Sequence, residues 1–93
     1  MTTSKEVTIE HEVGLHARPA AIFAKQASQF TSTISIENIT KGSAPVNAKS
    51  VLRLLSAGIQ AHDRLRITAE GEDAQDAVTV LYELIHRNFQ EAQ

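Results

Sequence analysis

Apolar and polar side chains alternate along three stretches of the chain, and this period of two residues is typical of strands that bury one face. The alternating apolar positions are Val7 and Ile9, then Ile34 and Ile36, then Leu65, Ile67 and Ala69. A further short strand is predicted over Ala44–Asn47, after Gly42 interrupts the chain. Because Pro45 has no N–H to donate within a central ladder, this strand is expected at an edge of the sheet.

Three other stretches follow the longer period of an amphipathic helix. The first begins at Ala17, and its apolar positions are Ala20, Ala21, Phe23, Ala24 and Ala27. The second covers residues 50–57, with apolar positions Val51, Leu52, Leu54 and Leu55. The third approaches the end of the chain, with apolar positions Ala77, Val78, Leu81, Leu84 and Ile85.

Turn-forming and capping residues stand where these helices should begin and end. Either Asn47 or Ser50 could cap the second helix, and Gly58 is expected to stop it. Gly71 and Asp73 are expected to open the last helix.

The predicted order of elements is therefore βαββαβα. Strands with one polar face favour an antiparallel sheet that is open to water on one side and covered by helices on the other. The predicted fold class is α+β, an open-faced β-sandwich, and 93 residues are expected to form one domain over residues 1–93.

Composition removes several classes of function. The chain has no cysteine, so no thiolate can act as a nucleophile or metal ligand. Its net charge is −2 with both signs scattered, and its four aromatic residues are dispersed, which disfavours nucleic acid as a partner. Residues 1–6 contain no apolar signal-peptide core and no apolar stretch is long enough to span a bilayer, so a cytoplasmic protein without membrane insertion is expected. No cofactor is predicted. No metal site is predicted either, because His11, His62 and His86 lack metal-ligand spacing.

The candidate chemistry lies where a loop becomes the first helix. His16 stands at this junction, with Gly14 before it and Pro19 inside the first turn. The amides of Ala17 and Arg18 have no intrahelical acceptor there, and a helix N-terminus attracts phosphate. The Arg18 guanidinium suits phosphate oxygens, and the same positive field favours a neutral, nucleophilic imidazole. A lone histidine is usually a loop or cap residue, but these neighbours favour a site that accepts a phosphoryl group.

Three segments resemble one known family. Gly14-Leu15-His16-Ala17-Arg18-Pro19-Ala20 resembles the active-site signature of HPr, the histidine-containing phosphocarrier of the bacterial sugar phosphotransferase system. Val46-Asn47-Ala48-Lys49-Ser50-Val51 is similar to the family's regulatory-serine segment, and Ala69-Glu70-Gly71-Glu72-Asp73 to its turn into the last helix. The resemblance covers roughly residues 5–86 in the family's order.

The resemblance implies a four-stranded antiparallel sheet with three helices on one face. It also implies that Enzyme I, which draws on phosphoenolpyruvate, phosphorylates His16 at Nδ1, and that the group passes to enzyme II A domains for sugar uptake. Arg18 would assist the phosphoryl group. In family members that carry the regulation, an ATP-dependent kinase phosphorylates the serine that matches Ser50, so the resemblance adds an HPr kinase/phosphorylase and a catabolite regulator as candidate partners. The chain would act as a monomeric phosphoryl-transfer intermediate rather than a self-sufficient enzyme.

The chain also departs from the family's pattern. Val13 stands where many members carry a small polar residue, and the connection from Glu37 to Pro45 is about three residues longer than usual. Residues beyond His86 extend past the family's common end. Lys41-Gly42-Ser43 matches the end of a phosphate loop, but the upstream glycine and the strand-to-helix context are missing.

The short second helix offers more apolar residues than one side of it can bury. Val51, Leu52 and Leu55 are therefore candidates for an exposed patch on which partners dock. Ser50 has two interpretations, as a helix cap and as a regulatory phosphorylation site.

Two other functions are compatible with the pattern. A carrier in a nitrogen-related or other regulatory phosphorelay would use the same chemistry in another pathway. A non-catalytic ferredoxin-like binding module would need the same helices and strands, although the lack of basic and aromatic surface disfavours it.

His11, His62 and His86 are interpreted as surface residues, and Arg64 and Arg66 as solubilising side chains on the open face.

Overall fold

The computed structural model describes residues 1–10, 14–87 and 89, and its elements follow the predicted order βαββαβα. The elements are β1 (Thr2–Thr8), α1 (Ala17–Ala27), β2 (Thr33–Asn38), β3 (Val46–Asn47), α2 (Val51–Ser56), β4 (Arg64–Glu70) and α3 (Ala74–His86).

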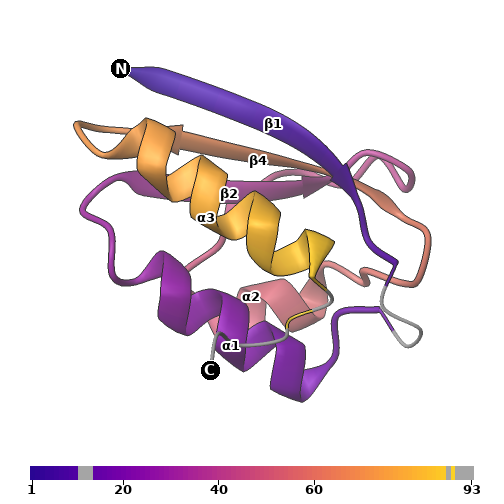
Figure 1. Cartoon of the computed structure of the whole chain (residues 1–93). Helices are drawn as coiled ribbons and strands as arrows, with labels where there is room; N and C mark the ends of the chain where they lie inside the picture. Colours follow the sequence, from indigo (N-terminus) through magenta and orange to yellow (C-terminus); the bar gives the residue numbers. More distant parts are fainter. Residues whose placement is uncertain (11–13, 88, 90–93) are drawn as a thin grey trace.

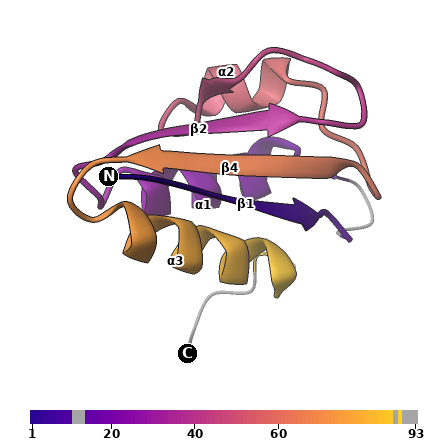
Figure 2. The same cartoon turned by 90° about the horizontal axis from the view of Figure 1, so that it is seen from above.

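The strands form one antiparallel sheet in the order β1-β4-β2-β3. All three helices lie on the same side of it, α3 along the β1 edge and α2 toward β3, as Figure 1 and the view from above in Figure 2 show. The predicted open-faced α+β sandwich is confirmed. The strand that follows Pro45 lies at an edge, as expected, but forms ladder pairs only at Val46 and Asn47.

The first strand begins earlier than the hydrophobic alternation predicted. The side chains of residues 2–5 are all polar and show no alternation. Even so, Thr2 pairs with Glu70, and the ladder continues without a break to the pair of Thr8 and Arg64. Backbone pairing with β4, rather than burial of side chains, therefore determines where β1 begins. Ile9 lies beyond the strand's last residue but is fully buried.

The core fills the space between the sheet and the helices. Ile34, Ile36, Leu65 and Ile67 project from the sheet with at most 1% of each side chain exposed. The helices contribute fully buried side chains, among them Phe23, Leu54 and Leu81.

The open face of the sheet is polar. Arg66 donates to Glu37 at 2.9 Å and to Glu6 at 3.2 Å, and Arg64 donates to Glu6 at 2.8 Å. The hydrogen bonds from Arg64 and Arg66 lower the pKa of Glu6. These pairs link β1, β4 and β2 across the face that was predicted to be exposed. No aromatic side chain of β1, β2 or β4 is available for stacking on a base.

Candidate functional site

The loop that leads into α1 is held close to the turn after α2. Gly14 is buried and has a φ of +71°, and a Cβ added there would lie 2.6 Å from the Ile59 carbonyl oxygen. The next residue, Leu15, is buried, and its N–H donates to the same carbonyl at 3.1 Å. Only glycine fits this position, because both the backbone angle and the space exclude a side chain.

This anchoring places His16 at the N-cap of α1, where its side chain is exposed. Its backbone is extended, with φ −103° and ψ −167°, and its carbonyl accepts the Ala20 N–H at 2.8 Å as the first hydrogen bond of the helix. The imidazole does not cap the helix. The ring is therefore presented at the surface while its backbone is fixed.

The first turn of α1 has the features that favour an anion. Ala17 and Arg18 occupy its first two positions and are exposed, and their N–H groups have no intrahelical acceptor. No acidic residue lies in this turn. Pro19, which has no N–H, is buried and directs the helix into the core together with Ala20. The structure thus places His16, Ala17 and Arg18 in succession at the start of α1, with all three exposed.

The segment that resembles the regulatory-serine segment, residues 46–51, runs from β3 through a turn to the start of α2. Helix α2 packs beside α1. Ser50, rather than Asn47, is the N-cap: its Oγ accepts the Arg53 N–H at 3.2 Å. The Asn47 side chain instead accepts the Lys49 N–H at 2.9 Å, within the turn before the helix. Gly58, with φ +64°, follows the helix where a stop was predicted.

The predicted docking residues are exposed on α2. Val51 is 37% exposed, Leu52 76% and Leu55 40%, while Leu54 between them is fully buried. Among the described residues, these three belong to a set of five exposed large hydrophobic residues, the others being Met1 and Val80. A six-residue helix that exposes three large apolar side chains is unusual for a surface that contacts only water.

The other histidines lie elsewhere. His62 is exposed and its Nδ1 is 3.5 Å from a Glu10 carboxylate oxygen, and His86 stacks on Tyr82 with ring centroids 5.8 Å apart. His11 and Val13 lie outside the described residues. No group of potential metal ligands is found in the part of the chain that the structure describes.

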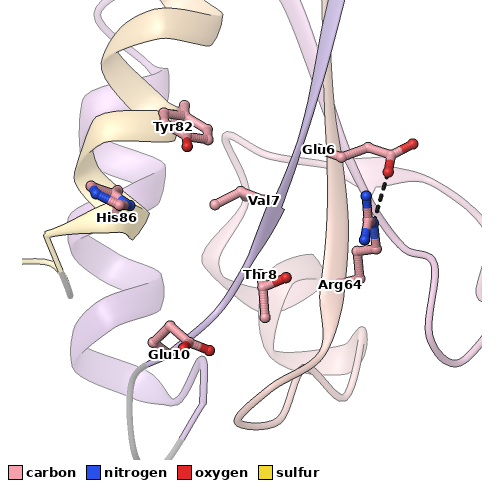
Figure 3. A pocket seen from close by; sticks show the side chains of 7 residues that line it. All are labelled: Glu6, Val7, Thr8, Glu10, Arg64, Tyr82 and His86. Carbon is pink, nitrogen blue, oxygen red and sulfur yellow. Dashed lines mark hydrogen bonds and ion pairs between the residues drawn. The ribbon is translucent and has the colours of Figure 1, made fainter.

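A pocket of about 350 Å³ lies between β1 and α3, and Figure 3 shows its lining. Its side chains are Glu6, Val7, Thr8, Glu10, Arg64, Tyr82 and His86. None of the predicted site residues lines it. No helix within the described residues is long and apolar enough to cross a membrane.

Comparison with known families identifies the family to which the chain belongs. The family model described as "PTS HPr component phosphorylation site" matches residues 3–87. The chain belongs to the PTS HPr family. An HPr-like protein, Crh from Halalkalibacterium halodurans, is 40% identical over 83 residues, which cover 89% of this chain and 95% of Crh.

A solved structure, HPr-C-His from Thermoanaerobacter tengcongensis, superposes with a TM-score of 0.88 at 37% identity, covering 98% of this chain and 99% of that chain. An HPr dimer from the same organism superposes with a TM-score of 0.73 at 44% identity, covering 94% of this chain and 99% of that chain.

Longer proteins contain a related segment. A multiphosphoryl transfer protein from Haemophilus influenzae is 45% identical over 74 residues, 80% of this chain but 15% of that protein. The chain spans between 15% and 22% of the length of the multiphosphoryl transfer proteins that it matches.

Proposed function

We propose that this HPr-family chain is a phosphocarrier that accepts a phosphoryl group on His16 from Enzyme I and transfers it to enzyme II A domains for sugar uptake. The observation that carries the proposal is the exposed imidazole of His16 at the N-cap of an eleven-residue helix whose first two amides, with Arg18, favour an anion. The name of the Haemophilus relative, a multiphosphoryl transfer protein, supports the same chemistry.

Each transfer exchanges one bond to phosphorus for another. The Nδ1 lone pair of His16 attacks the phosphorus carried by Enzyme I, and the bond between phosphorus and Enzyme I breaks as the new P–N bond forms. The displaced group of Enzyme I takes the electron pair. In the second transfer the acceptor on the II A domain attacks, and the His16 ring leaves. No nucleotide or external proton donor is needed in either step.

The first turn of α1 stabilises the phosphorylated ring without burying it. The N–H groups of Ala17 and Arg18 can donate to phosphate oxygens, and the Arg18 guanidinium can donate two parallel hydrogen bonds. Because the ring stays at the surface, a partner reaches the phosphorus directly. A carrier needs both properties, since its phosphoryl group must be held briefly and then released.

The apolar patch of Val51, Leu52 and Leu55 on α2 is proposed as the docking surface for Enzyme I and the II A domains. Ser50 begins the same helix and is partly exposed, which supports a regulatory role when an HPr kinase/phosphorylase is present. We further propose that the chain works as a monomer in the cytoplasm, where these partners act, although the solved HPr dimer shows that related chains can associate.

The test is transfer through the chain rather than labelling alone. Radiolabelled phosphoenolpyruvate, Enzyme I and a II A domain are mixed with catalytic amounts of the chain, and label on the II A domain is followed over time. The proposal expects label to appear on the II A domain only when the chain is present. Label that enters the chain and never leaves it would contradict the carrier role.

A further inference from the structure

Both stems of the loop that carries His16 are hydrogen-bonded to one turn, which we call the supporting turn (residues 59–63). The incoming stem is Ile9, whose N–H donates to the Asp63 carbonyl at 3.0 Å and whose carbonyl accepts the His62 N–H at 2.7 Å. The outgoing stem is Leu15, whose N–H donates to the Ile59 carbonyl at 3.1 Å. The position of the His16 backbone therefore depends on the conformation of this turn.

The supporting turn is itself held by one buried carboxylate. Asp63 is 6% exposed, and its Oδ2 accepts the Gln60 N–H at 2.9 Å, which closes the turn. The same oxygen accepts from the Asn38 Nδ2 at 2.8 Å, and Asn38 is 1% exposed at the end of β2. Burial opposes ionisation of Asp63, but these donors together with the nearby Lys41 ammonium keep its pKa below the usual value.

The charge that compensates this carboxylate comes from the long connection between β2 and β3. The Lys41 Nζ lies 3.5 Å from the Asp63 Oδ2 and also donates to the Gly58 carbonyl, just after α2. The Lys41 backbone N–H donates to the Asn38 Oδ1 at 3.2 Å, which holds the start of the connection next to Asn38. Lys41 thus joins the end of α2 to the turn that supports the His16 loop.

From this chain of contacts we propose that Asp63 and Lys41 are positioning residues for phosphoryl transfer at His16. They touch neither the imidazole nor the phosphate; they fix the supporting turn, which fixes Leu15 and the packing of Gly14, and so the angle at which the ring and the α1 amides meet a partner. By supplying Lys41, the connection between β2 and β3 neutralises a carboxylate that would otherwise be buried with only neutral donors. This inference rests on the proposed function, because it concerns the geometry of the same transfer.

The test compares Lys41→Met and Asp63→Asn with the unaltered chain. Two measurements are made: the steady-state kinetics of phosphorylation by Enzyme I, and the amide NMR shifts of residues 14–18. Both variants should lower kcat about tenfold with KM little changed, since misplacement by a fraction of an ångström slows transfer without altering the α2 patch. The shifts of residues 14–18 should move in both variants, and Lys41→Arg should restore both readouts.

Two controls separate positioning from general loss of stability. Lys25→Met removes an exposed ammonium on α1 that makes no ion pair within the described residues. Asp73→Asn removes the charge of another hydrogen-bonded carboxylate. That carboxylate joins the start of α3 to residues 31 and 32 and does not contact the supporting turn. Both controls should keep the kcat of the unaltered chain at a temperature where each remains folded.

Normal kcat and unchanged shifts of residues 14–18 in Lys41→Met and Asp63→Asn would overturn the positioning role. So would an equal fall of kcat in Asp73→Asn, because the effect would then follow stability alone. Failure of the unaltered chain to accept label would instead contradict the proposed function. The NMR comparison needs no transfer, so the two failures can be told apart.

Discussion

Asp73, the N-cap residue of α3, accepts the Thr31 N–H at 2.8 Å and so joins the start of the last helix to the turn after α1. Its other carboxylate oxygen accepts the Ser32 N–H at 2.9 Å and a short hydrogen bond from the Ser32 hydroxyl. The hydrogen bond from the Ser32 side chain, followed by the Thr31 amide, lowers the pKa of Asp73 to about 2. The side chain makes no hydrogen bond to its own helix.

This arrangement predicts a pH-dependent contribution to stability. The folded pKa lies below the ordinary value of 3.8, so the ionised carboxylate stabilises the fold above that value, and the stabilisation is lost as the pH falls through about 2. Asp73→Asn should lower the melting temperature by several degrees at pH 7. The difference from the unaltered chain should shrink between about pH 5 and pH 2. A difference that stays constant over this range in thermal unfolding would contradict the account.

Gly14 and Gly42 have similar φ angles, but other atoms pack closely only around Gly14. Substituting each of them therefore separates the cost of a steric clash from the cost of the backbone conformation. Gly42 has a φ of +64° with no atom within 4 Å of an added Cβ, while Gly14 has a φ of +71° and would place a Cβ 2.6 Å from the Ile59 oxygen. Gly42→Ala should cost about 1–2 kcal/mol of unfolding free energy, the ordinary penalty of the left-handed region. Gly14→Ala should cost at least about 1 kcal/mol more, because the backbone must also shift. Urea denaturation of both variants measures the difference, and equal losses would show that the approach to Ile59 is not tight.

Arg18 is expected to serve the phosphoryl group rather than the fold. Its side chain is exposed, and it makes no hydrogen bond or ion pair within residues 1–10, 14–87 and 89. Arg18→Ala should slow transfer from Enzyme I by at least about tenfold, because hydrogen bonds to a charged group are lost, and should change stability by less than about 0.5 kcal/mol. The transfer rate of Arg18→Lys should lie between those of the unaltered chain and Arg18→Ala, because an ammonium keeps the charge but lacks the planar fork of a guanidinium. Equal transfer rates for all three proteins would remove Arg18 from the site.

Ser50 offers a matched pair of substitutions. Aspartate and asparagine cap helices about as well as serine, so both Ser50→Asp and Ser50→Asn should keep the bond to the Arg53 amide and the melting temperature. Only the aspartate adds a charge beside Val51, and a partner that covers the patch must desolvate it. Ser50→Asp should therefore raise the KM for Enzyme I severalfold, while Ser50→Asn should not. An equal effect of the two variants would show that the charge is not the cause.

Much of the fold and of the site could be predicted from local pattern. The alternation of Ile34 and Ile36 and the junction at His16 are local features, and the observed sheet and N-cap agree with them. The early start of β1 could not be predicted, because it depends on pairing with residues more than 60 positions away. The role of Asp73 and the contact of Lys41 with Asp63 could not be predicted for the same reason, since their partners come from distant segments.

The most direct test of the account is the site of labelling. The unaltered chain, His16→Ala and His62→Ala are incubated with Enzyme I and radiolabelled phosphoenolpyruvate; His62 is the control because it is also an exposed imidazole but has no helix N-terminus beside it. The unaltered chain and His62→Ala should each take up one acid-labile, base-stable phosphoryl group, and His16→Ala should take up none. Label that persists in His16→Ala, or disappears in His62→Ala with the fold intact, would contradict the assignment of His16 as the phosphoryl acceptor.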